Sequence, residues 1–184
     1  MCTIRLFKEK DREKVEQICI ATGSELAKKN VLLQEALLTV FCRYYIEQEQ
    51  GNCFVAVNEQ DEAVGYVFCA KDFHTWEQQF NRIYLKDSNN KMVVSIGQAT
   101  IYGLGSFAEE YPAHLHINIH PEFQGKGLGT KLIDALKLHL IECEVKGLML
   151  CVGNDNEKGK NFYRKYGFTE LKQEEKEVFM GYKL

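Results

Sequence analysis

The feature that most constrains the fold is a strand, a glycine-rich turn and a long helix that follow one another between residues 113 and 144. Residues 113–120 alternate strictly between apolar and polar side chains, which predicts a β-strand with one face in a core and one face in water. Glycines stand at positions 125, 127 and 129, and residues 128–144 repeat apolar side chains at the spacing of an amphipathic helix. This order is typical of a fold that packs helices against a sheet.

The glycine-rich turn has the composition of an anion site. Glycines let the backbone approach a ligand closely, and the first N–H groups of the following helix lack partners inside the helix. The helix dipole adds roughly half a positive charge at this end, so a phosphate or pyrophosphate is the natural occupant, and Lys126 and Lys131 would strengthen the site. An ordinary turn without a ligand is the alternative. The Rossmann fingerprint would need a glycine where Thr130 stands, and the P-loop pattern has no match.

Other periodic segments predict helices and strands in mixed order. Helical spacing predicts helices over residues 11–23, 31–49, most of 73–110 and 156–165, and apolar or alternating runs predict strands at 3–7, 53–57, 63–70, 148–152 and 178–182. The chain has 184 residues, 45% of them hydrophobic, and no linker-like stretch, so we expect a single domain over residues 1–184. The order of elements indicates an α/β (α+β) fold.

Charge and cysteine content disfavour several classes of protein. The 23 Lys and Arg against 26 Asp and Glu leave a net charge of −3, which gives no general attraction for nucleic acid. The 7 cysteines are odd in number and include no C-x-x-C pair, so reduced thiols are expected. We also expect no metal, because no cluster has ligand spacing, and no membrane contact, because the apolar runs are short. A cytoplasmic protein is the expectation.

The turn belongs to a longer pattern that carries a family resemblance. The run INIHPEFQGKGLG, residues 117–129, resembles motif A of the GNAT superfamily, the Gcn5-related N-acetyltransferases, and NEKGKNFYRKYGF, residues 156–168, is similar to the motif that follows it. Two motifs in the right order are more specific than either alone. The resemblance implies a GNAT-like twisted mixed β-sheet with splayed central parallel strands flanked by helices.

The resemblance also implies an activity. A GNAT enzyme uses acetyl-CoA as co-substrate and transfers the acetyl group to a primary amine, here of a small molecule or a peptide, in a monomer or homodimer. A non-catalytic acyl-CoA-binding module stays open as the alternative. In such a fold the pantetheine arm lies along the splayed strand, the pyrophosphate on the glycine turn, and Asn156 near the thioester. The implied cofactor residues are Ile117, Asn118, Ile119, Gln124, Gly125, Lys126, Gly127, Leu128, Gly129, Thr130, Asn156 and Tyr163.

Acetyl transfer to an amine needs a group that accepts the amine proton and one that protonates the departing thiolate. By resemblance Tyr163 is the general acid, with packing in the core as the alternative. His116 and His114 are candidate bases, because imidazole titrates near neutral pH and both lie on one strand face, which could instead be a solvated face. Some family members carry a glutamate where this chain has Cys151, so that base is missing here.

The acceptor side is less determined by the sequence. In the superfamily it is built from the early helices and the loop near the hairpin, and packing in the hydrophobic core is the equal alternative. The aromatic residues concerned are Tyr44, Tyr45, Phe73, Trp76 and Phe80.

Overall fold

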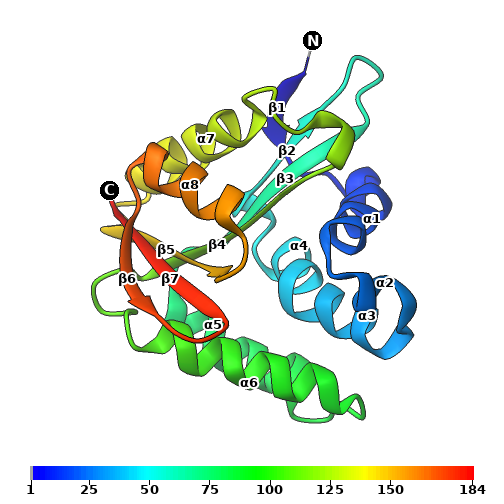
Figure 1. Ribbon diagram of the computed structural model, residues 1–184, viewed down its shortest axis with the longest axis vertical. Coiled ribbons are helices and arrows are strands. Elements are labelled where there is room, and N and C mark those ends of the chain that lie inside the picture. The colour runs from blue at the N-terminus through cyan, green and yellow to red at the C-terminus, as the bar shows by residue number, and fades with distance from the viewer. Residues whose placement is uncertain (1) are drawn as a thin grey trace.

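A twisted mixed sheet of seven strands forms the centre of the computed structural model, which describes residues 2–184 (Figure 1). The strands are β1 (Thr3–Leu6), β2 (Cys53–Val57), β3 (Ala63–Ala70), β4 (Ala113–Ile119), β5 (Gly147–Gly153), β6 (Thr169–Gln173) and β7 (Glu177–Lys183). Their order in the sheet is β1-β2-β3-β4-β5-β7-β6. Only the pair β4 and β5 is parallel among the described strands, so the predicted mixed sheet is confirmed.

Helices account for most of the remaining chain. They are α1 (Arg12–Thr22), α2 (Glu25–Lys29), α3 (Val31–Leu38), α4 (Tyr44–Gln48), α5 (Phe73–Phe80), α6 (Lys91–Gly105), α7 (Leu128–Glu142) and α8 (Glu157–Tyr166). A π-helical segment, Thr39–Arg43, joins α3 to α4, and another, Asn81–Leu85, extends α5. The predicted helical character of residues 73–110 is therefore confirmed. In residues 2–184, no helix combines the length and the apolar character that a bilayer crossing requires.

The helices form two layers, one on each face of the sheet (Figure 1). One hydrophobic cluster packs α7 against β3, β4 and β5, with aromatic rings of α8 at its border. The other packs α1 and α3 to α6 against the opposite face, and its largest fully buried side chain is Trp76 of α5. Burying a ring of this size contributes several kcal/mol, so the second layer is firmly attached.

The two parallel strands separate soon after they meet. β4 pairs with β5 only at Ala113 with Leu148 and at His114 with Met149, whereas its pairing with β3 continues to Ile119. From Leu115 onward, the β4 edge that faces β5 has no strand partner within the described chain. Apart from the Ile119 carbonyl oxygen, which accepts from the Gln124 amide, its backbone N–H and C=O groups are therefore available to a ligand, because such groups need partners. The predicted splay is confirmed.

One detail of the sequence analysis is wrong. The polar face of β4 was expected to be in water, but the His114 side chain is only 1% exposed and His116 is half-buried. The helical layer of α1 and α3 to α6 covers this face, and Tyr45 and Trp76 contact His114. The strict alternation of apolar and polar residues in β4 therefore marks two faces that are both covered by helices, rather than one face in the core and one in solvent.

Candidate active site

The glycine turn joins β4 to α7 with two residues in the left-handed conformation. Gly125 and Gly127 both have φ of 74°, a region that costs a residue with a Cβ about 1–2 kcal/mol. A Cβ added at either position would meet no atom within 4 Å among the described residues. The backbone conformation therefore requires glycine here, and the space above the turn is open to a ligand.

Gly127 is also the N-cap of α7, and no described side chain caps this helix end. The first N–H groups of α7 thus keep their hydrogen-bonding capacity, and the dipole favours an anion beside them. Gln124 stands next to the turn: its amide donates to the Ile119 carbonyl oxygen at 3.1 Å, and its own oxygen accepts from Lys158 Nζ at 2.8 Å. Lys158 comes from α8, so both motifs meet at this point.

A cavity of about 390 Å³ opens above the turn, between β4 and α8. Its lining contains every residue of the expected cofactor set except Lys126, whose ammonium lies 4.8 Å from the centroid of the Phe123 ring. The sequence analysis missed three lining residues, Lys158, Gly159 and Phe162. All three lie within the second motif, and Gly159 stands three residues after Asn156 and four before Tyr163, which places these three on one helix face, so for Gly159 this spacing was the available signal.

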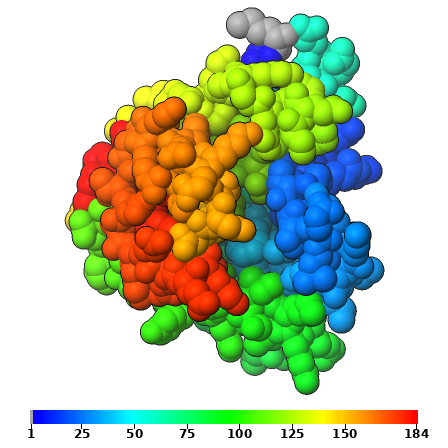
Figure 2. Space-filling model, in the orientation of Figure 1, coloured from blue at the N-terminus to red at the C-terminus, as the bar shows by residue number. Residues whose placement is uncertain are grey.

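A second cavity, of about 260 Å³, lies on the other face of the sheet. It is lined by Phe41, Thr100, Leu104, His114, Leu115, His116, Leu150, Cys151, Gly153, Lys176, Glu177 and Phe179. Leu115 and Leu150 are the residues that follow the last paired positions of β4 and β5. The two cavities therefore approach β4 from opposite faces where its pairing with β5 ends. Figure 2 shows a hollow between the chain after β5, in orange, and the α2–α3 segment, in blue.

The two histidines of β4 have different neighbours, but the pKa of each is lowered. His114 Nε2 lies 3.0 Å from the Tyr45 hydroxyl, and its Nδ1 has no hydrogen-bond partner among the described residues. Burial, and then the neighbouring His116, lower the pKa of His114 to about 3, and burial lowers the pKa of His116 to about 4. Both imidazoles are therefore neutral at pH 7. The His116 ring lies 4.5 Å from Phe41 in the second cavity, where a neutral imidazole can accept a proton.

These lowered pKa values predict a loss of stability in acid. Between about pH 6.5 and the folded-state pKa values near 4 and 3, His114 and His116 are protonated in the unfolded chain but neutral in the folded chain. The free energy of unfolding should fall by several kcal/mol as the pH drops through this window. Urea unfolding at intervals from pH 7 to pH 4 measures the slope, which His114→Gln should make shallower. The control, His74→Gln, changes a side chain that is 58% exposed and should keep the wild-type slope; equal slopes in all three proteins would contradict the prediction.

Tyr163 and Asn156 lie on the cofactor side of the sheet. Tyr163 packs beside Phe162 and Phe168, with ring centroids 5.3 and 5.6 Å away, and burial raises the pKa of its hydroxyl well above the ordinary value. The phenol therefore stays protonated at physiological pH and can donate a hydrogen bond. Asn156 is the N-cap of α8 and accepts from the Gly159 N–H at 2.9 Å, so its oxygen also orients the start of that helix.

The aromatic residues expected on the acceptor side form the hydrophobic core, which was the alternative reading. The five side chains are each no more than 2% exposed, and Trp76 stacks on Phe80 with centroids 5.3 Å apart. Aromatic and aliphatic residues from other segments wall the second cavity instead. These are Phe41, Leu104 and Phe179, and the sequence analysis named none of them.

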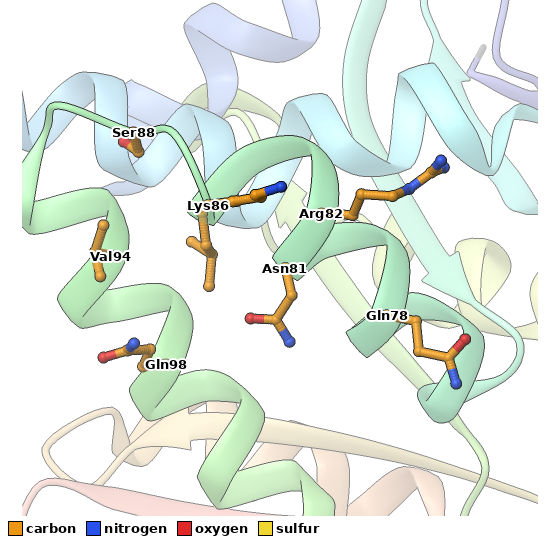
Figure 3. Close-up of a pocket in the computed structure, with 8 residues that line it drawn as sticks. Gln78, Asn81, Arg82, Lys86, Ser88, Val94 and Gln98 are labelled. Carbon is orange, nitrogen blue, oxygen red and sulfur yellow. The ribbon is translucent and has the colours of Figure 1, made fainter.

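A third hollow on the described surface lies away from both cavities. A depression of about 640 Å³ lies between α6 and the end of α5, where Gln78, Asn81, Arg82, Lys86 and Gln98 surround it (Figure 3). Neither the glycine turn nor the β4–β5 gap contributes to its lining. Among residues 2–184, His, Cys, Asp and Glu form no group of three or more that could hold a metal ion.

Comparison with known proteins places this geometry in a family. The family model described as acetyltransferase (GNAT) family matches residues 24–168. Mycothiol acetyltransferase of Propionibacterium freudenreichii subsp. shermanii is 38% identical over 53 residues, which are 29% of this chain and 17% of that protein. The alignment thus spans only a small part of that relative.

Two solved structures share the fold over nearly their whole length. The structure of SsHAT has a TM-score of 0.89 at 25% identity, covering 99% of this chain and 98% of that one. The PaiA N-acetyltransferase of Thermoplasma acidophilum, solved in complex with coenzyme A, has a TM-score of 0.68 at 15% identity, covering 100% and 99%. The family match includes both sequence motifs, the splayed strands and the turn between them. The chain therefore belongs to the GNAT family of acetyltransferases.

Proposed function

We propose that this chain is an acetyl-CoA-dependent N-acetyltransferase, which transfers the acetyl group to a primary amine of a small molecule or peptide by direct attack on the thioester. The observation that carries the proposal is the arrangement of two cavities on opposite faces of β4, at the point where its pairing with β5 ends. A thioester held from one face can there meet an amine that enters from the other.

The residues of the first cavity fit coenzyme A. The left-handed glycines and the uncapped start of α7 provide backbone donors for a pyrophosphate, and Lys158 adds a positive charge at the same rim. The unpaired edge of β4 after Leu115 offers backbone groups to the two amides of a pantetheine arm. The coenzyme A complex of the PaiA N-acetyltransferase, which has the same fold, supports this assignment.

The chemistry follows from the groups beside the gap. The amine nitrogen forms a bond to the thioester carbonyl carbon, the C–S bond breaks, and the amine gives up a proton. His116 faces the second cavity and is unprotonated at pH 7; because its pKa of about 4 makes it a weak base, it relays that proton to water rather than keeping it. Tyr163 keeps its proton and lines the first cavity, so its hydroxyl can donate to the departing thiolate.

A direct assay tests the proposed function. Purified protein is incubated with acetyl-CoA and a panel of primary amines, free CoA is measured with a thiol reagent, and the products are identified by mass spectrometry. We expect CoA release that depends on the amine, together with an acetylated product. Tight binding of acetyl-CoA in calorimetry without turnover on any amine would instead support a non-catalytic acyl-CoA-binding module.

A further inference from the structure

Glu177 places a carboxylate in the second cavity, called the acceptor cavity below, beside the gap between β4 and β5. It is the only carboxylate among the described residues that line this cavity. On β7 it alternates with Phe179 and so lies on the same face of the sheet, because side chains two residues apart on a strand point the same way. Glu177 pairs with Gly153 of β5, whose missing side chain leaves its carboxylate uncovered on that side.

The Glu177 carboxylate lies on the same side of the sheet as the opening between β4 and β5. Cys151 is the second residue of β5 beyond Met149, the last that pairs with β4. Burial, followed by the nearby charge and hydrogen bonding of Glu177, raises the pKa of the Cys151 thiol. Glu177 therefore lies near Cys151 on the neighbouring strand, and its negative charge lines the cavity that opens onto the gap. No acidic residue of β5 could take this place, because β5 has none.

The cavity is small, and part of its wall is apolar. Phe41, Leu104 and Phe179 form its walls, and α6 crosses Phe179 so closely that a Cβ on Gly103 would lie 2.6 Å from the ring. This close approach fixes the ring in place, because a packed side chain can move only if its neighbours yield. A cavity of about 260 Å³ lies below the usual range of roughly 300–1,000 Å³ for small-molecule sites. It suits a compact body rather than an extended peptide.

Lys176 restricts the charge of the acceptor. Like Glu177, which it precedes in the chain, it lines the same cavity and is exposed at the surface. A positive charge at the rim opposes a second cationic group on the acceptor, since like charges at short range repel. One negative charge near the gap and one positive charge at the rim therefore select for a single ammonium group.

Building on the proposed function, we propose that the acceptor is a small monoamine with one ammonium group and a compact apolar body, and that Glu177 binds this ammonium group beside the thioester. The carboxylate draws the protonated amine from solution and holds its nitrogen near His116. The apolar walls then take up the hydrocarbon part of the acceptor.

An acceptor panel tests the class of substrate. 2-Phenylethylamine, putrescine, phenylalanine and a tetrapeptide with a free amino terminus differ in charge and in size. We expect kcat/KM for 2-phenylethylamine to exceed that of each other compound by about threefold or more, since Glu177 and Lys176 are exposed and solvent weakens charge interactions at such positions. A preference for any of the other three would overturn the inference.

A charge-neutral substitution tests the role of Glu177. Glu177→Gln should raise KM for 2-phenylethylamine by about two- to fivefold, as expected for the loss of an exposed ion pair, with a smaller change in kcat. With aniline, which is uncharged at neutral pH, the same variant should behave like the wild type. Glu175→Gln removes the same charge from an exposed neighbour outside the cavity and serves as the control. Equal effects of Glu177→Gln on both acceptors would refute the assignment.

A change in cavity size separates this inference from the proposed function. Thr100→Phe adds volume to the cavity wall from α6 and should lower kcat/KM for 2-phenylethylamine more than for methylamine. Acetyl-CoA affinity, measured by calorimetry, should stay unchanged because Thr100 lies outside the first cavity. If no amine is acetylated while acetyl-CoA binds, the proposed function fails. If amines are acetylated but Thr100→Phe affects both equally, only the present inference fails.

Discussion

Replacing Gly127 by glutamate is expected to weaken acetyl-CoA binding by about a hundredfold or more, close to 3 kcal/mol. Gly127 has φ of 74°, and a Cβ added there would meet no described atom within 4 Å. The new carboxylate would therefore project from the start of α7 into the open cavity. It would take the helix N–H groups and the dipole that the pyrophosphate uses, and it would repel the pyrophosphate directly.

Gly127→Ala is the matched control for this variant. Alanine imposes the same backbone strain, about 1–2 kcal/mol, but adds no charge and little volume. Calorimetry with acetyl-CoA on both variants, with circular dichroism to confirm folding, then isolates the effect of charge. We expect alanine to weaken binding only slightly. Similar affinities of the two variants would show that no negatively charged part of the ligand lies at Gly127.

The sequence predicted those parts of the fold that depend on local periodicity. The hairpin strands have the predicted bounds, Cys53–Val57 and Ala63–Ala70, because apolar runs separated by a polar turn have one compact solution. The helix after the glycine turn begins at Leu128 as expected, since its apolar repeat starts there. The short strand β6 was missed because its sequence, TELKQ, is polar and lies at the sheet edge, where pairing rather than burial determines the structure.

The acceptor cavity could not be predicted in the same way, because its lining comes from five separate segments. Phe41 belongs to the π-helical segment, Leu104 to α6 and Glu177 to β7, and no spacing in the sequence connects them. The aromatic residues that were expected there belong to α4 and α5 and are buried in the core, because a ring in an apolar segment packs wherever the core needs volume. The residues that line the first cavity were more accessible to sequence reasoning, since nearly all of them lie in two continuous motifs.

The difference between local periodicity and contacts of distant segments also explains the outcome for the polar face of β4. Alternation correctly predicted that Ile117 and His116 point to opposite faces, and Ile117 lines the first cavity while His116 lines the second. It could not show that helices cover the polar face, because those helices come from residues far away in the chain. Their cover lowers the pKa of His116 to about 4 and so keeps the imidazole neutral at physiological pH.

Tyr163→Phe is expected to lower kcat by about a hundred- to ten-thousandfold, the usual contribution of a proton donor, while acetyl-CoA affinity stays within about twofold of the wild type. The substitution removes one oxygen and leaves the ring against Phe162 and Phe168. Since burial keeps the Tyr163 phenol protonated, its loss removes a donor to the departing thiolate and no charge. Pre-steady-state measurement of CoA release separates this chemical step from product release.

Tyr166→Phe is the control that decides the role of Tyr163. Both tyrosines lie on α8, but the Tyr166 hydroxyl donates to Asp134 Oδ1 of α7 at 2.7 Å and does not line the cofactor cavity. Its removal should cost roughly 1 kcal/mol of stability and leave kcat near the wild-type value. If Tyr163 served only to pack α8 against the sheet, the two variants would lose stability alike and keep their turnover. A large fall in kcat for Tyr163→Phe alone therefore requires that its hydroxyl acts on the reacting atoms.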